Sequence, residues 1–543
     1  MKTISLGLAS ILTFSTALAS PIEVRSSSPQ VTIKNGTIRG VTNSALGAEA
    51  FLGLPYARAP RFGNPIPVDD AFDGVFDASS YGNICPGYGV SSTSNATAGQ
   101  NYVIDEDCLN INVIRPAGTT EDDKLPVLFW IYGGGFVQGT ANDPRYNGTY
   151  LVQRSVDIGK PIIFASINYR VAAFGFPAGQ AAADAGVLNL GLKDQRAALR
   201  WVQENIGAFG GDKSKVTIWG QSAGGASVVS QMLAYGGDTS GYSLFRAAIS
   251  DSGVFATQNA SIASQAPSWQ RFLDAAGCGD DLKCLRALPF DTVFAAANGT
   301  FNPAVIPDGD FVQGPTFKQI GQNKVLRIPL VLGANHDEGT SGIGAPMGIQ
   351  NDTQFRSAVA RAYSTLSLSN KTIDEFLTVF PDDPSRGCPF GTGNGVLPTG
   401  LQDKRINWVY TDGLHAGVRY LAQKHSKRAP VYKYHFTQVP QNGTIDAGVA
   451  HFYEIPYIFG VMDQTVRNPM SQRPGDLETS RYMQEYWINF VHDLKPSASG
   501  APEWKKYYEG QQVLDIQNYN TKMLDDTYRK ASISFLTDLA SAK

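Results

Sequence analysis

Charged residues are scarce in this sequence, and neither sign is in marked excess. Asp, Glu, Lys and Arg make up 17% of the 543 residues, and the net charge at pH 7 is −3. Without a basic excess the chain has little with which to neutralise phosphates, so a nucleic acid is not an expected partner. Hydrophobic residues make up 43%, which suffices for a large core and excludes disorder for the bulk of the chain.

Long apolar runs are missing except near the N-terminus. Residues 4–18 are apolar and small, follow Met1-Lys2, and lead into Ala17-Leu18-Ala19, which fits the small-x-small cleavage rule. Serines and threonines interrupt the run, which is shorter than the roughly 20 residues that a membrane span needs. We therefore predict a signal peptide over residues 1–19, a secreted, extracellular protein and no transmembrane segment.

Histidine and cysteine are also few, with six and five copies. No group of them has the spacing of metal ligands, so the sequence implies no metal and no cofactor. In a secreted chain, five cysteines suggest two disulfides and one leftover thiol. The local pairs would be Cys85–Cys108 and Cys278–Cys284, leaving Cys388, although the sequence alone does not fix the connectivity.

Secretion would also expose the chain to N-glycosylation. Chance supplies some N-x-[ST] sequences, but in the secretory path many would carry glycans and therefore lie on the surface. The eight candidate asparagines are Asn35, Asn95, Asn147, Asn259, Asn298, Asn351, Asn370 and Asn442.

Short β-branched and aromatic runs alternate with helical patterns along the chain. Strands are expected at residues 127–132, 161–168, 216–219, 247–250 and 328–332, with a helix over 194–206. Near-continuous apolar strands separated by helices indicate an α/β fold, with a mostly parallel sheet covered on both faces. No repeat or linker divides the chain, so we predict one domain over residues 20–543.

A nucleophile motif follows one of these strands. Val216–Trp219 runs directly into Gly220-Gln221-Ser222-Ala223-Gly224, which is G-x-S-x-G at a strand-to-helix turn. Such a turn holds the serine hydroxyl out at the sheet edge, and the glycines let the backbone pass close by. The five-residue pattern also occurs by chance in glycine-rich turns, but the strand before it and the helical pattern after it favour a nucleophile.

A second glycine motif follows the strand at 127–132. Gly133-Gly134-Gly135 leaves backbone N–H groups unshielded, so they can point at a developing alkoxide. Losing one such donor costs about 2.7–4 kcal/mol of transition-state stabilisation in other hydrolases. The alternative is a phosphate-binding turn. No Lys-Ser/Thr follows at Walker spacing, however, and Gln138 stands where G-x-G-x-x-G requires a glycine.

Further motifs surround these two. They are Asn168-Tyr169-Arg170-Val171, Gly191-Leu192-Lys193-Asp194-Gln195-Arg196, Phe209-Gly210-Gly211-Asp212, Glu106-Asp107-Cys108-Leu109-Asn110 and Pro307-Asp308-Gly309-Asp310-Phe311. Together with the nucleophile motif, they resemble the type-B carboxylesterase/lipase family, which is the cholinesterase-like branch of the α/β-hydrolases. Within this family the resemblance is greatest to the fungal secreted carboxylesterases. The likeness spans roughly residues 28–535. It implies an α/β-hydrolase fold and a serine esterase.

The resemblance implies a Ser-His-Glu triad in the chain order that this fold keeps. Ser222 would be the nucleophile. The family's acid loop matches the segment after the strand at 328–332, which makes Glu338 the acid; Asp337 is a local competitor that the residues alone do not separate from it. The family's histidine loop matches Gly448–Tyr457, which makes His451 the base.

The same matching assigns supporting groups. The oxyanion donors would be the backbone N–H groups of Gly134, Gly135 and Ala223. Ser252 resembles a serine that orients the acid, with a simple turn residue as the alternative. Cholinesterases carry an acidic residue just before the nucleophile, whereas this chain has Gln221.

The implied reaction is hydrolysis of a carboxylic ester through a covalent acyl-enzyme, with a small-molecule ester as substrate. In the family's lipases, the loop between the first two half-cystines is a long amphipathic lid. Here the stretch from Cys85 to Cys108 is short and rich in Gly and Ser, which favours short- to medium-chain or soluble esters. The alternatives are a lipase or steryl esterase acting on long-chain lipid esters, and a cholinesterase-like binding domain without catalysis.

Overall fold

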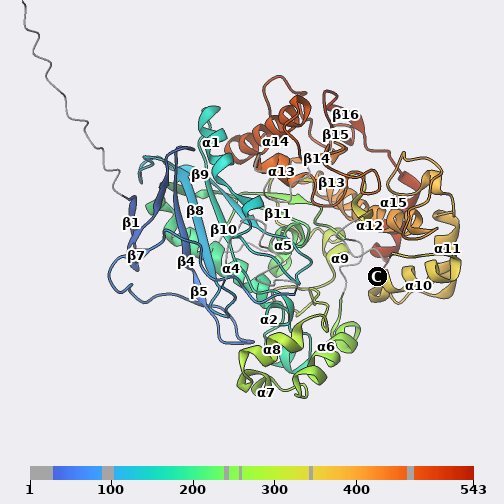
Figure 1. The fold of residues 1–543 in the computed structure, drawn as a ribbon, viewed down its shortest axis with the longest axis horizontal. Coiled ribbons are helices and arrows are strands. Elements are labelled where there is room, and N and C mark those ends of the chain that lie inside the picture. The colour runs from blue at the N-terminus through green and yellow to red at the C-terminus, as the bar shows by residue number, and fades with distance from the viewer. Residues whose placement is uncertain are drawn as a thin grey trace, which may run out of the picture.

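The computed structural model describes residues 28–88, 103–237, 244–255, 260–340, 347–461 and 470–542. The expected signal peptide and two of the candidate glycosylation sites, Asn95 and Asn259, lie outside these ranges. Within them, an eleven-stranded sheet runs through the molecule in the order β16-β15-β14-β13-β12-β11-β9-β10-β8-β4-β3 (Figure 1). Seven adjacent strands, from β15 to β10 in this order, are parallel to one another. The strands at both edges pair antiparallel to their neighbours.

The five runs predicted as buried strands are β9, β10, β11, β12 and β13, so the prediction of a mostly parallel sheet is confirmed. The strands are β1 (Gln30–Ile33), β2 (Gly36–Arg39), β3 (Val41–Asn43), β4 (Ala48–Pro55), β5 (Ala57–Arg58), β6 (Ile66–Pro67), β7 (Phe76–Asp77), β8 (Asn110–Pro116), β9 (Leu125–Ile131), β10 (Ile163–Ile167), β11 (Gly211–Gln221), β12 (Ala247–Asp251), β13 (Leu330–Asn335), β14 (Val431–Phe436), β15 (Gln512–Ile516) and β16 (Lys522–Asp525).

Helices cover both faces of the sheet, with α1 and α14 packed on one and α4, α5 and α12 on the other (Figure 1). The helices are α1 (Thr149–Asp157), α2 (Ala172–Gly175), α3 (Gln180–Asp184), α4 (Leu190–Asn205), α5 (Ala223–Leu233), α6 (Ile262–Ala276), α7 (Leu282–Ala287), α8 (Phe290–Ala297), α9 (Thr316–Gly321), α10 (Asp352–Ala362), α11 (Asn370–Val379), α12 (Asp403–His425), α13 (Ile455–Phe459), α14 (Pro474–Asp493) and α15 (Lys530–Ser541). No helix among the described residues is long and apolar enough to cross a membrane.

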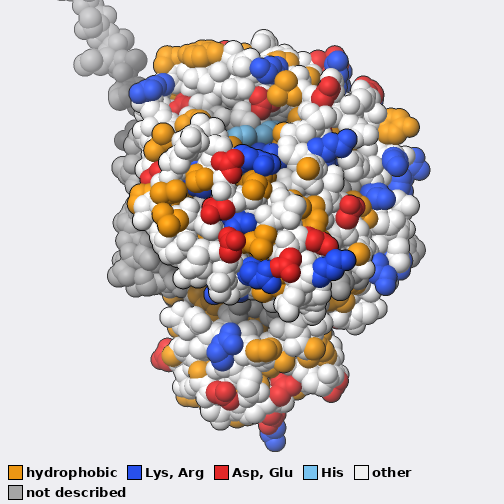
Figure 2. Space-filling model, turned by 90° about the vertical axis from the view of Figure 1, so that its right-hand side faces the viewer, with side chains coloured by type: hydrophobic (Ala, Val, Ile, Leu, Met, Phe, Trp, Pro, Cys, Tyr) orange, Lys and Arg blue, Asp and Glu red, His pale blue; other side chains and the backbone are white. Residues whose placement is uncertain are grey.

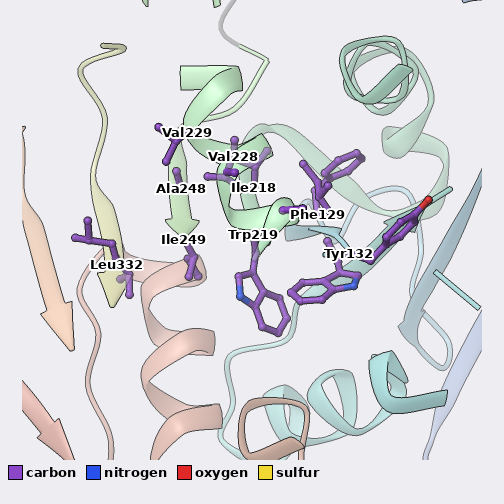
Figure 3. Packing of buried hydrophobic residues seen from close by; sticks show 14 of the residues in the cluster. Phe129, Tyr132, Ile218, Trp219, Val228, Val229, Ala248, Ile249 and Leu332 are labelled. Carbon is purple, nitrogen blue, oxygen red and sulfur yellow. The ribbon is translucent and has the colours of Figure 1, made fainter. Parts of the chain in front are cut away.

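Successive side chains of the central strands point to opposite faces of the sheet and pack into the core layer on each face. Figure 3 shows Ile218 of β11 pointing toward Val228 of α5, while its neighbour Trp219 points to the opposite side of the sheet. There the Trp219 ring stacks on Phe459 of α13, with 4.7 Å between ring centroids. Because both faces are covered, these strands read in the sequence as continuous apolar runs rather than alternating ones.

Helices α6, α7 and α8 form a smaller lobe at the bottom of Figure 1, with its own cluster of buried apolar residues. Figure 2 shows this lobe narrower than the main body, and acidic and basic side chains mixed over the visible face. The lobe contacts the main body partly through Phe290 of α8, whose ring centroid lies 6.2 Å from that of Phe174 in α2. The single domain over residues 20–543 stays a prediction.

Disulfides join Cys85 to Cys108 and Cys278 to Cys284, the two local pairs considered from the sequence. The second bridge ties the loop after α6 to α7 in the smaller lobe. Cys388 is free and buried, and burial raises the pKa of its thiol well above the usual value.

The candidate glycosylation sites differ in their exposure. Asn298, Asn351, Asn370 and Asn442 are exposed and Asn147 is half-buried, so a glycan can leave the surface at these positions. Asn35 is a correction to the expectation of surface sites. It is 2% exposed, and its Nδ2 donates to the carbonyls of Val68 and Asp70 at 3.0 and 2.9 Å. In the folded protein this nitrogen has no room for an oligosaccharide.

A buried ion pair fastens α4 to the loop after β10. Arg170 Nη2 lies 2.6 Å from Asp194 Oδ1 and its Nε lies 2.8 Å from Oδ2, and both residues are buried. The backbone N–H of Arg170 also donates to Asp194 Oδ2, and Arg170 Nη1 donates to the Gly63 carbonyl. The bidentate geometry fixes the helix that packs against the nucleophile strand.

Replacing Asp194 with alanine should leave the Arg170 guanidinium buried and unpaired. Breaking such a pair costs about 3–5 kcal/mol, because the remaining charge keeps its desolvation penalty. Denaturant unfolding of Asp194→Ala should show this loss, whereas the Lys160→Ala control, which opens the exposed ion pair with Asp493, should lose less than about 1 kcal/mol. Equal losses in the two variants would contradict the prediction.

Candidate active site

Ser222 occupies a strained turn between β11 and α5. Its φ of 58° and ψ of −124° lie outside the regions that non-glycine residues favour. Glycines make the turn possible: a Cβ on Gly220 would lie 2.4 Å from the carbonyl carbon of Gly224, and one on Gly224 would lie 2.0 Å from the Ile131 oxygen. The turn therefore requires glycine at both positions that flank the serine in the G-x-S-x-G pattern.

His451 hydrogen-bonds to Glu338 through a very short contact between Nδ1 and Oε2. Glu338 follows β13 and is fully buried, and His451, in the loop after β14, is 8% exposed. The other carboxylate oxygen, Oε1, accepts from the Ser252 hydroxyl and from the Asn335 backbone N–H, both at 2.6 Å. Two donors thus hold Oε1, while Oε2 meets His451.

Asp337, the sequence competitor for the acid, has other partners. Its Oδ1 accepts from the Phe390 N–H at 2.8 Å, and its Oδ2 accepts from the Val449 N–H at 2.9 Å. The carboxylate therefore braces the loop that carries His451 from behind, while the side chain of Glu338 meets the imidazole.

The imidazole of His451 has a second neighbour that the sequence reasoning did not assign. Gln221 Nε2 lies 3.2 Å from His451 Nε2. With Nδ1–H donating to the carboxylate, Nε2 is left as the acceptor, so the Gln221 amide donates to it. At this position, where the cholinesterases carry an acidic residue, the neutral Gln221 amide caps Nε2 of the imidazole.

The triple glycine lies against the nucleophile. A Cβ on Gly133 would come within 2.9 Å of the Ser222 Cβ, so this position requires glycine. Gly134 and Gly135 have φ of 104° and 64°, which also favours glycine. Among the described residues, no backbone acceptor is paired with the N–H groups of Gly134, Gly135 or Ala223.

Two buried carboxyl groups beneath the site were also missed from the sequence. Asp251 accepts from the Trp219 indole at 2.5 Å and from the Tyr434 hydroxyl at 2.9 Å. Burial, reinforced by the nearby Glu338 charge, raises the pKa of Asp251 to about 7, although the two donors act against this rise. Glu454 accepts from Asn335 at 2.5 Å, and burial followed by the charges of Glu338 and Asp251 raises its pKa well above the usual value. The only sequence signals were their positions next to Ser252 and three residues after His451.

Three other histidines cluster behind the acid loop. His336 Nδ1 lies 3.2 Å from His435 Nε2, and His415 contacts the Asn335 carbonyl at 2.8 Å. Burial lowers the pKa of each, so they pack as neutral rings. Within the described residues, no three His, Cys, Asp or Glu side chains are grouped so that they could hold a metal ion.

Known proteins are similar to this chain in sequence and in fold. The model of the carboxylesterase family matches residues 27–536. The chain belongs to the carboxylesterase family. It is 33% identical to "Lipase 4" of Diutina rugosa, over 94% of this chain and 95% of that protein. It is 32% identical to "Secreted lipase 1" of Botryotinia fuckeliana, over 95% of this chain and 94% of that protein. Its structure is similar to that of EstA from Aspergillus niger, with a TM-score of 0.80 and 27% identity over 94% of this chain and 98% of that chain.

Membership confirms the resemblance read from the motifs and the α/β-hydrolase fold. The protein is a carboxylic ester hydrolase, as its family and its lipase and esterase relatives show.

The buried Asp251 gives a pH-dependent test of the network under the site. An aspartate in an unfolded chain titrates near pH 4, so between about pH 4 and 7 the native state holds a proton that the unfolded state has released. The stability that this group contributes therefore falls as the pH rises through that window. Asp251→Asn cannot release the proton, so its free energy of unfolding relative to wild type should rise by about 1.4 kcal/mol per pH unit and level off above about pH 7.

Denaturant unfolding of both proteins at several pH values measures this difference. A difference that stays constant from about pH 4 to 8 would contradict the raised pKa.

Proposed function

We propose that this carboxylesterase hydrolyses its substrate through a Ser222-His451-Glu338 triad and a covalent acyl-enzyme. The hydrogen bond between His451 Nδ1 and Glu338 is the observation that carries the proposal. It fixes the imidazole in the tautomer with an unprotonated Nε2, which is the form that accepts a proton from a serine hydroxyl.

The reaction follows from these roles. His451 Nε2 takes the proton of Ser222 as its oxygen attacks the ester carbonyl, and the N–H groups of Gly134, Gly135 and Ala223 bind the resulting oxyanion. His451 then protonates the leaving alcohol, and the acyl-enzyme forms. Water repeats the sequence, with His451 again as the base, and releases the acid and the free Ser222 hydroxyl.

Two neighbours support these steps. Ser252 holds Glu338 through its 2.6 Å hydrogen bond, so the carboxylate cannot rotate away from the imidazole. Gln221 donates to His451 Nε2 in the absence of substrate, and this hydrogen bond must give way when the imidazole accepts the serine proton. The glutamine therefore orients the resting imidazole without adding charge to the site.

The substrate that we propose is a short- to medium-chain or soluble ester, handled outside the cell. The short, glycine- and serine-rich stretch between Cys85 and Cys108 supports this choice, although residues 89–102 lie outside the described part of the chain. Secretion is supported by the N-terminal sequence and by relatives named secreted lipases. Those names favour a second candidate, a lipase for long-chain esters.

Replacing Ser222 with alanine should abolish ester hydrolysis while leaving the fold intact. Loss of a serine nucleophile lowers kcat by roughly a million-fold in a comparable triad enzyme. Turnover of p-nitrophenyl acetate and the thermal melt of Ser222→Ala measure the two expectations. Activity within about tenfold of wild type in a folded variant would contradict the assignment.

The acyl preference separates the two candidate substrates. We expect fast hydrolysis of p-nitrophenyl acetate, butyrate and hexanoate, with a steep fall for dodecanoate and palmitate, all lost in Ser222→Ala. Preference for palmitate, or a rise in rate when the substrate passes its solubility limit, would favour the lipase instead.

A further inference from the structure

A cavity of about 230 Å³ opens beside α4, away from the residues proposed for catalysis. One wall is the outer face of α4, from Lys193 to Glu204. The opposite wall comes from the chain around β6 and from Lys34, and Tyr235 and Phe311 close one end. None of the triad or oxyanion residues lines this cavity. Its volume lies below the roughly 300 Å³ at which drug-sized pockets begin, so it suits a small ligand.

Positive charge dominates the lining. Among the described lining residues, Lys34, Lys193, Arg196 and Arg200 are basic and Glu204 is acidic. Glu204 already pairs with Lys34, at 2.8 Å, and Lys34 also binds Asp69 at 2.9 Å. The single carboxylate of the lining is therefore paired with Lys34, and the other three basic residues, Lys193, Arg196 and Arg200, give the cavity a net positive charge.

The two arginines lack acidic partners within the part of the chain that the structure describes. No Asp or Glu oxygen there lies within ion-pair distance of Arg196 or Arg200. Arg196 is partly buried, its Nε is fully shielded from solvent without an acceptor, and its Nη1 reaches only Gln231 Oε1, at 3.4 Å. Burial lowers the pKa of Arg196, and Arg200 beside it acts in the same direction. Shielded charges in proteins are normally paired, so this guanidinium lacks the partner that its environment calls for.

An apolar surface lies next to these charges. The Arg196 guanidinium is 5.7 Å from the centre of the Tyr235 ring. That ring packs edge-on against Phe311, with centroids 5.4 Å apart. Tyr56 and Trp201, the latter one turn further along α4 from Ala197, add two more aromatic residues to the lining. A ligand that meets the arginines would also meet these rings.

We propose that this cavity is a second binding site of the enzyme, for a small organic carboxylate. The carboxylate lies between the guanidinium groups of Arg196 and Arg200, whose planar donor pairs match its two oxygens. The apolar body of the ligand lies against Tyr235 and Phe311. A bare inorganic anion would leave the rings uncovered, and a neutral molecule would leave the arginines unpaired.

Calorimetric titration of the whole protein with sodium benzoate and with sodium octanoate tests the proposal. Benzoate has an aromatic apolar part and octanoate an aliphatic one, so the two affinities show which kind of ligand the cavity prefers. We expect at least one of them to bind saturably, about tenfold more tightly than inorganic phosphate or benzyl alcohol. Arg196→Gln should weaken that binding by about tenfold, and Arg200→Gln by several-fold. Arg271→Gln removes the same charge from α6, which does not line the cavity, and should bind like wild type.

Arg200 is exposed, so Arg200→Gln keeps the test valid if Arg196→Gln fails to fold. Arg196→Lys adds a check on geometry, because it keeps the charge but loses the paired donors, and it should also bind more weakly. Carboxylate binding that is unchanged in the Arg196 and Arg200 variants would overturn the site. Phosphate or benzyl alcohol binding as tightly as the tighter-binding carboxylate would overturn its proposed chemistry.

Discussion

The hydrogen bond between His451 and Glu338 is the contact on which the rest of the site depends. It joins two loops whose residues are 113 positions apart in the chain, and it does so in a nearly water-free environment. A buried carboxylate is costly unless its oxygens are paired, and here Ser252 and Asn335 complete that pairing. Burial raises the pKa of the neighbouring Asp251 and Glu454, and the nearby Glu338 acts in the same direction, so these two carboxyl groups are driven toward their neutral forms.

The parallel sheet explains how such distant residues meet. The strands β9, β11 and β13 run in the same direction, and each ends in a loop that carries part of the site: the triple glycine, Ser222 and Glu338. His451 follows β14, the next parallel strand. Carboxyl ends of parallel strands share one edge of the sheet, which is where this fold class places its chemistry. The ion pair between Arg170 and Asp194 holds the α4 layer against this frame.

Most of the frame could be predicted because it rests on local signals. Continuous apolar runs gave the buried strands, and the crowding around Gly220 and Gly224 requires the residues that form the nucleophile motif. The choice between Asp337 and Glu338 could not be made from the residues alone, since both are acidic and adjacent. Only the fold shows that Asp337 is occupied by the N–H groups of Phe390 and Val449. The burial of Asn35 and the contact of Gln221 with His451 likewise depend on segments far away in the sequence.

Covalent labelling of the nucleophile tests the central claim most directly. A fluorophosphonate ester reacts with a serine only when a base and an oxyanion site activate that serine, and the adduct can be located by peptide mass spectrometry. One adduct per chain is expected, on Ser222, and it should form in step with the loss of ester hydrolysis. An inactivated enzyme with its label on another residue, or an active enzyme in which Ser222 stays unlabelled, would contradict it.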